Sequence, residues 1–284
     1  GKDAGNDITT GDSNVAVGTN ALDAVTDKSK NVAIGYGALT NSTQQQCTAV
    51  GYNAATSNTT GYITAVGHSA ANSHTTGDQN SCFGNSSMSS LTTGSYNTAV
   101  GQNALYSMTT NSNSVAVGRN ALFSATGGSN TALGKDAGST ITSGTNNSCI
   151  GLGAEPSSAT ANNEITLGNS SISSLRCNDT SISSLSDRRD KTDIVNLTTG
   201  LDFLNTLQPR QFKWQTRDGN SKDGLIRAGF IAQELQEAQK DCDFLDLVMD
   251  NNPDKLEAKQ EHLIPVLVKA IQELSAKVVA LEAR

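Results

Sequence analysis

A serine and a lysine that could act together in acyl transfer lie five positions apart, at Ser186 and Lys191. A neutral lysine amine can take the proton of a serine hydroxyl, which then attacks a carbonyl carbon. A histidine base is hard to supply here, because the chain has only three histidines, His68, His74 and His262. A serine and a lysine at this spacing are, however, more often a capped turn beside a solvated charge.

The residues between this pair decide whether the lysine can act as a base. It must lose its proton, which requires burial or a cationic neighbour. Arg188 and Arg189 could be that neighbour, with Asp187 as a further supporting residue. Asp190 has the opposite effect, because an adjacent carboxylate favours the charged ammonium.

The stretch also marks a change of composition. Residues 1–185 contain 6 Lys and Arg and 10 Asp and Glu, whereas residues 186–284 contain 14 and 17. Under a tenth of the first segment is therefore charged, against nearly a third of the second. Such a contrast predicts two different folds.

The first segment is a repeat in which a short apolar run ends in glycine. The glycines recur at spacings of 16 or 17 residues, at Gly1, Gly18, Gly35, Gly51, Gly67, Gly84, Gly101, Gly118, Gly134, Gly151 and Gly168. Most units continue with Ala-Leu or a similar pair and then a polar turn, often Thr-Thr-Gly. This regularity predicts stacked structural units.

A unit this short cannot bury a core alone, so the coils must stack in parallel register. We expect a parallel β-solenoid over residues 1–168, with two short strands and two turns per coil. Cys82 and Cys149 replace the alanines of other coils, which predicts small buried residues rather than reactive thiols. So thin a solenoid favours association of several chains.

Residues 169–185 form a Ser- and Ile-rich junction, and a small α+β domain is predicted over residues 186–284. Its expected elements are a helix over 200–207 with Thr199 as N-cap, strands over 211–214 and 225–232, a loop over 217–224, a helix over 231–238 and a turn over 251–254. Trp214, the only tryptophan, is expected to anchor the core.

The last stretch, residues 261–284, has the clearest pattern. Apolar residues alternate spacings of three and four, at Ile264, Leu267, Ile271, Leu274, Val278 and Leu281. This is the seam of a coiled coil, and it is too short to hold together alone. We favour a trimeric coiled coil, and contact between its chains would bury Lys191.

Composition argues against several partners. With a net charge of -7 the chain offers no basic surface for nucleic acid or anionic membranes. We find no membrane-spanning run and no signal peptide. Five widely spaced cysteines without a Cys-x-x-Cys pair make disulfides and a metal site unlikely, and no cofactor motif occurs.

The repeat resembles those of trimeric bacterial adhesin heads and phage tail fibres, in which Ala-Val-Gly-x-Asn-Ala-Leu units recur. The C-terminal segment resembles the intramolecular chaperone domain of phage endosialidases and tail spikes, a self-cleaving serine peptidase family. Three ordered motifs carry this second resemblance: residues 186–191, Gly229-Phe230-Ile231-Ala232-Gln233-Glu234, and residues 263–274. At the position of Asp190, relatives often have an apolar residue.

The second resemblance implies that the C-terminal domain trimerises, aligns the repeats and is then released. Ser186 would attack the carbonyl of Leu185, with Lys191 as general base, so that the chain is cut between Leu185 and Ser186. We therefore expect a viral tail-fibre segment, made in the host cytoplasm, that trimerises and contacts a host cell-surface receptor, with a glycan as one candidate.

Three other functions fit parts of the sequence. A bacterial cell-surface adhesive fibre with the same chaperone is the main one. A depolymerising enzyme is disfavoured, because no paired carboxylates occur at a fixed site of the repeat. An ice-binding surface is disfavoured because the turn residues vary between coils. No enzymatic action on an external substrate is expected.

Overall fold

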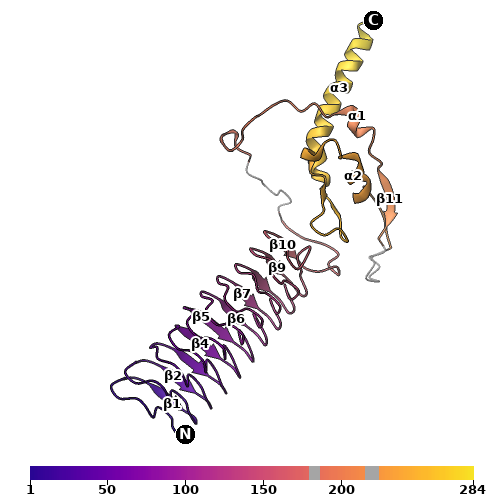
Figure 1. Cartoon of the computed structure of the whole chain (residues 1–284). Coiled ribbons are helices and arrows are strands. Elements are labelled where there is room, and N and C mark those ends of the chain that lie inside the picture. Colours follow the sequence, from indigo (N-terminus) through magenta and orange to yellow (C-terminus); the bar gives the residue numbers. More distant parts are fainter. Residues whose placement is uncertain (179–185, 215–223) are drawn as a thin grey trace. The chain divides into compact units, whose positions relative to one another are not determined.

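The computed structural model describes residues 1–178, 186–214 and 224–284. The chain divides into two compact units, Gly1–Ser170 and Ser171–Arg284 (Figure 1). The first is the solenoid unit and the second the C-terminal unit. The predicted loop over 217–224 lies almost entirely outside the described residues.

The solenoid unit is a stack of coils with one strand each, which form a single ten-stranded parallel sheet in sequence order. This confirms the predicted parallel β-solenoid. The strands are β1 Val15–Val17, β2 Val32–Ile34, β3 Thr48–Val50, β4 Ile63–Val66, β5 Asn80–Phe83, β6 Thr98–Val100, β7 Val115–Val117, β8 Thr131–Leu133, β9 Ser148–Ile150 and β10 Ile165–Leu167.

Each strand pairs with the same positions of the next coil. Ala33, for example, lies opposite Ala49, and Ala65 lies opposite Cys82. No other residue type fits in place of the glycine that follows each strand. Gly18, for example, has φ 127°, and a Cβ there would lie 2.4 Å from the carbonyl oxygen of Gly35. Only glycine tolerates both that φ and that approach.

The second strand predicted for each coil is wrong. The Asn-Ala-Leu segment forms a tight turn instead, because its first and third residues take positive φ, as at Asn20 (57°) and Leu22 (59°). The backbone still bonds to the next coil, since the Leu22 N–H donates to the Ala38 carbonyl (3.0 Å). Left-handed leucine is strained by about 1–2 kcal/mol, and burial of the side chain offsets that cost.

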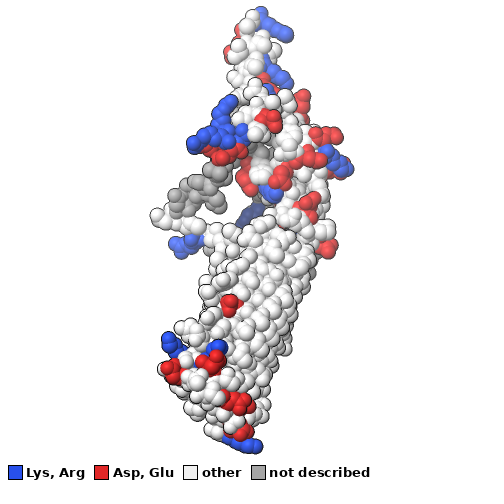
Figure 2. All heavy atoms as spheres, turned by 60° about the vertical axis from the view of Figure 1, so that its left-hand side comes forward, with Lys and Arg blue, Asp and Glu red and all other residues white. Residues whose placement is uncertain are grey.

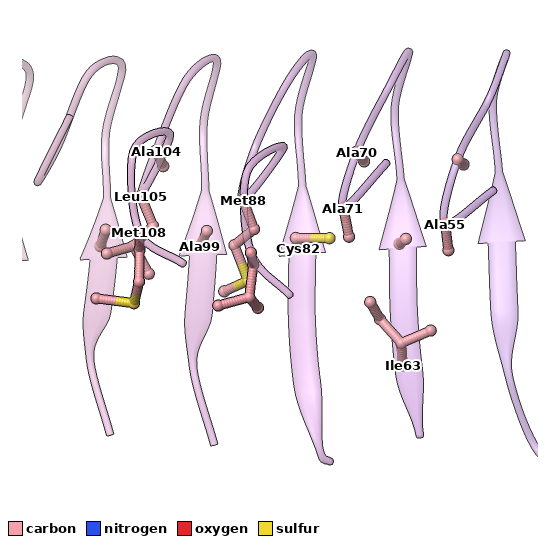
Figure 3. Close-up of a cluster of buried hydrophobic side chains, with 14 of the residues drawn as sticks. Ala55, Ile63, Ala70, Ala71, Cys82, Met88, Ala99, Ala104, Leu105 and Met108 are labelled. Carbon is pink, nitrogen blue, oxygen red and sulfur yellow. The ribbon is translucent and has the colours of Figure 1, made fainter. Parts of the chain in front are cut away.

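The interior is narrow and apolar. Alanines and cysteines from the strands meet Leu, Met and Ile side chains from the turns; Figure 3 shows Cys82, Ala99, Met88 and Leu105, all fully buried. Burial raises the pKa of Cys82 to about 12 and that of Cys149 to about 11. The predicted burial of both cysteines is confirmed.

A column of buried asparagines runs along one corner of the interior. The Asn97 N–H donates to Asn80 Oδ1 (3.0 Å), and Asn97 Nδ2 donates to the Asn111 carbonyl (3.0 Å). The Ser114 N–H then donates to Asn97 Oδ1. No buried side-chain nitrogen or oxygen of the described residues lacks a hydrogen-bond partner, so this polar column is satisfied in full.

The outer face of the sheet carries a line of apolar side chains, one per coil. We call this line the apolar column: Val17, Ile34, Val50, Val66, Phe83, Val100, Val117, Leu133, Ile150 and Leu167. Most of its members are exposed in the single chain. A soluble strand normally places polar residues on such a face.

The C-terminal unit is a small α+β fold. Its elements are η1 Arg188–Asp190, α1 Leu201–Leu204, β11 Arg210–Lys213, β12 Ile226–Gly229, α2 Ala232–Ala238, η2 Asp243–Leu245, β13 Val248–Met249, β14 Glu257–Ala258, η3 Gln260–Leu263 and α3 Ile264–Glu282. Both two-stranded sheets are antiparallel. The core joins residues of α2, η2, β13, η3 and the start of α3.

Two predictions for this unit are wrong. Trp214 does not anchor the core: it is 48% exposed and meets Phe212 edge-on (5.4 Å), because it follows a two-stranded hairpin rather than a larger sheet. Thr199 does not cap α1. The N-cap is Gly200, and the N–H of Leu201 instead donates to Glu273 Oε2 of α3 (2.9 Å).

Candidate functional site

The serine and lysine are joined by a single turn, η1. Its N-cap is Asp187, whose Oδ1 accepts a hydrogen bond from the Arg189 N–H (2.8 Å). The turn closes when the Lys191 N–H donates to the Arg188 carbonyl (3.2 Å). Short 3₁₀ turns of this kind need such a cap, because their first N–H groups have no partner within the turn.

The turn brings the two predicted reactive groups together. Lys191 Nζ donates a hydrogen bond to Ser186 Oγ at 2.6 Å. We call this pair the dyad. Both residues are exposed in the single chain. The distance between the two groups suits proton transfer, but water has access to both.

The three supporting residues have different positions. Arg189 binds Asp187 through Nε (3.1 Å to Oδ1) and Nη2 (2.7 Å to Oδ2). This hydrogen bonding lowers the pKa of Asp187. The guanidinium expected to act on Lys191 is thus held by a carboxylate instead. Arg188 lies exposed within the turn, and Leu185, on the other side of the predicted scissile bond, lies outside the described residues.

The histidines are engaged elsewhere. His74 is buried in the solenoid, where its Nδ1 lies 3.0 Å from Asn58 Oδ1. His68 stacks on Tyr52 (5.1 Å). His262 Nδ1 contacts the carbonyl of Asp246 at 2.9 Å. Each histidine thus has a partner within its own fold.

The last helix, α3, has two faces with different surroundings. Val266 and Ala270 are buried against the rest of the C-terminal unit, and Glu273 on the same side bonds to Leu201. The predicted seam faces away from that core: Ile271 is 64% and Leu274 46% exposed. Sequence reasoning found the seam but missed Glu273, which has no motif.

The described residues hold no group of three or more His, Cys, Asp or Glu side chains placed to bind a metal. All five cysteines are free. In the described part of the chain, none of the helices combines the length and apolar character needed to cross a bilayer.

Comparison with known proteins identifies one segment. No curated protein and no solved structure matches the chain. A family match lies within the C-terminal unit and begins at the dyad serine. Residues 186–244 match the family described as chaperone of endosialidase, so this segment of the C-terminal unit is similar to that family.

Proposed function

We propose that the chain is part of a trimeric viral tail fibre whose C-terminal domain directs assembly and then cleaves itself off between Leu185 and Ser186. One observation carries this proposal. The 2.6 Å contact between Lys191 Nζ and Ser186 Oγ lies within residues that match the endosialidase chaperone family. In a chain without this family match, the same contact would indicate only a hydrogen bond exposed to solvent.

The cleavage is an acyl shift followed by hydrolysis. Neutral Lys191 takes the Oγ proton while Oγ attacks the carbonyl carbon of Leu185. The C–N bond then breaks, and the proton passes to the departing amine of Ser186. The resulting ester between Leu185 and Ser186 Oγ reacts with water. The products are the Leu185 carboxylate and a chain that begins with Ser186, its hydroxyl restored.

Assembly supplies what the single chain lacks. In the single chain both dyad residues are exposed to water. A neighbouring chain that covers the dyad would exclude that water and favour the neutral amine. Cleavage would then wait for correct assembly.

Two exposed apolar surfaces support association between copies of the chain. One is the seam of α3 and the other is the apolar column of the solenoid sheet. Each is a continuous line of side chains, and contiguous exposed apolar surface of this kind marks interaction sites. We assign both to other copies, because a coiled-coil seam and a repeated column each match an identical neighbour in register.

The seam of α3 does not by itself indicate three chains. Ile or Val at one seam position with Leu at the other is the pattern that favours two strands in isolated coiled coils. The three-fold state follows from the resemblance of the repeats to trimeric adhesin heads and tail fibres. A measured mass of the assembly decides between two and three.

A removable chaperone solves a specific folding problem. Ten near-identical coils can pack against those of another chain in registers shifted by one coil, each almost as favourable as the correct one. Pairing over long distances is also slow and exposed to aggregation. A domain that fixes stoichiometry and register first removes these competitors, and its loss then makes the fibre kinetically stable.

The solenoid is the part proposed to contact a host cell-surface receptor, with a glycan as one candidate ligand. Figure 2 shows a face on which charged side chains gather at the N-terminal end of the solenoid, are sparse over the rest of it and are dense over the C-terminal unit. A bacterial surface adhesive fibre with the same chaperone is the alternative. It is favoured by the likeness of the repeats to adhesin heads, and it would place the chain on a bacterial surface rather than on a virion.

Cleavage is tested by intact-mass measurement and denaturing electrophoresis of the purified chain. We expect two pieces that meet at the Leu185/Ser186 bond. Ser186→Ala and Lys191→Ala should stay whole, and so should Lys191→Arg, which keeps the positive charge but not the base. All three should keep the native mass of the assembly. A wild-type chain that stays whole while fully assembled would refute the cleavage.

A further inference from the structure

Asp187 lies between Ser186, the proposed nucleophile, and the turn that brings Lys191, the proposed base, back to that serine. Five extended residues span roughly 17 Å, so Ser186 and Lys191 meet only because the chain turns between them. The turn consists of three residues, Arg188–Asp190, and its N-cap bond comes from Asp187 Oδ1. The contact within the dyad therefore depends on this cap.

Arg189 completes the arrangement. It contributes three donors to one carboxylate: its own N–H (2.8 Å), Nε (3.1 Å) and Nη2 (2.7 Å). Two of these reach Oδ1 and one reaches Oδ2, so the carboxylate is held in a single orientation. The pair is exposed, with side chains 35% and 88% accessible for Asp187 and Arg189. Exposed ion pairs contribute little to global stability, so its effect is local.

We infer that Asp187 is a positioning residue for the self-cleavage: it caps the turn that delivers Lys191 to Ser186, and Arg189 clamps it in the capping orientation. This inference rests on the proposed function. Asp187 does not touch the reacting atoms. Because Arg189 neutralises its charge, Asp187 acts through the shape of the turn and not as a counter-ion of Lys191.

The test is the rate of cleavage of the full chain after assembly, measured by intact mass across a range of pH. Asp187→Ala removes the cap and should slow cleavage about fivefold, because the turn is populated less. Asp187→Asn keeps a good capping oxygen and should cleave within about twofold of wild type. The pH at half-maximal rate should be the same in both variants and in wild type.

Two controls make the outcomes separable. Asp193→Asn changes a nearby exposed aspartate beyond the turn and should leave the rate within about twofold of wild type. In the uncleaved Ser186→Ala background, adding Asp187→Ala should leave the native mass and the melting temperature of the assembly unchanged, so that slow cleavage cannot come from failed assembly.

Three results would overturn the inference: Asp187→Ala cleaved at the wild-type rate, Asp187→Asn as slow as Asp187→Ala, or a shifted pH profile in Asp187→Ala. In each case Ser186→Ala and Lys191→Ala would stay whole, and the proposed function would survive. Cleavage of those two at the wild-type rate would refute the dyad, and the positioning role with it.

Discussion

At the scale of single residues, the dyad is set by local backbone geometry. Ser186 and Lys191 lie on one turn, and the 2.6 Å contact needs no other element of the fold. A stretch of six residues is therefore enough to bring the two predicted groups into contact. What the local geometry does not supply is a dry environment, since both residues are exposed.

Asp190 allows a test of whether a carboxylate next to Lys191 slows cleavage. Replacing it by leucine, the type of residue that relatives often carry, removes a carboxylate next to the lysine. Because a neighbouring carboxylate favours the charged form of a lysine, we expect Asp190→Leu to speed cleavage about two- to fivefold at neutral pH. Asp190→Glu is the control and should behave as wild type. Equal rates for Asp190→Leu and wild type would show that the carboxylate has no influence.

At the scale of elements, the solenoid depends on its interior polar column. The asparagine pattern breaks between Asn31 and Asn80, and Asn58 and His74 fill the gap. Asn80 Nδ2 donates to the Gly94 carbonyl and lies 3.2 Å from His74 Nε2. His74 Nε2 must then accept, so the proton is on Nδ1 and is donated to Asn58. Protonation of Nε2 would break this arrangement.

Burial accordingly lowers the pKa of His74 from 6.5 to about 4, although Asp78 opposes the shift. Between these values the unfolded chain binds more protons than the folded one, so stability falls as pH falls from 6.5 to 4. The loss is on the order of 3 kcal/mol per chain. Urea unfolding of the uncleaved Ser186→Ala chain at several pH values should show this fall in the free energy of unfolding.

His74→Gln can keep both hydrogen bonds without titrating, so its stability should fall less over that range. His68→Gln, at the exposed histidine, should follow the parent protein. If the free energy of unfolding of His74→Gln fell with pH as steeply as that of the parent protein, His74 would not be the group responsible.

The C-terminal unit has its own inter-element link. Glu273 of α3 accepts the N–H of Leu201 at the start of α1, and this bond lowers the pKa of Glu273. A Cβ at Gly200 would lie 2.7 Å from the Glu273 carboxylate. Gly200→Ala should therefore displace that carboxylate and lower the melting temperature of this unit, as Glu273→Ala should. Glu282→Ala, on the same helix, should not. Each change is made in the uncleaved Ser186→Ala chain, and calorimetry of the assembled protein gives the melting temperature. An unchanged melting temperature for both Gly200→Ala and Glu273→Ala would show that this bond does not stabilise the unit.

At the scale of the whole molecule, assembly is the property on which the proposed function depends. Both units expose apolar lines that a single chain leaves uncovered. On α3 these residues are distinct from Val266 and Ala270, which hold the helix to its own domain. Changes in the seam can therefore be separated from changes in the fold.

Ile271→Asp places a charge in the seam and should abolish assembly and, with it, cleavage. Ala276→Asp places the same side chain on the opposite side of α3, where it is exposed, and should assemble and cleave as wild type. Light scattering gives the mass of each assembly. Normal assembly of Ile271→Asp would refute the role of the seam in association. A mass of two chains for wild type would refute the three-fold state.

A chain that ends at Leu185 tests the chaperone role directly. Without the C-terminal segment we expect single chains or irregular aggregates, because nothing fixes stoichiometry and register before the repeats pair. Regular three-chain assembly of this shortened product, seen by light scattering and electron microscopy, would refute that role.

The sequence by itself determined the parallel stack, its register and the position of the dyad. The 16- or 17-residue period leaves one way to satisfy the backbone, and the glycine after each strand admits no side chain. The six-residue motif likewise acts through one local turn.

Only the tertiary structure decided the rest. The left-handed turn at Leu22 opposes local preference and exists because burial and bonds to the next coil outweigh it. Glu273 caps a helix 72 residues away, and Trp214 is exposed because its hairpin has only two strands. These features depend on contacts between distant segments, which no local pattern of residue types encodes.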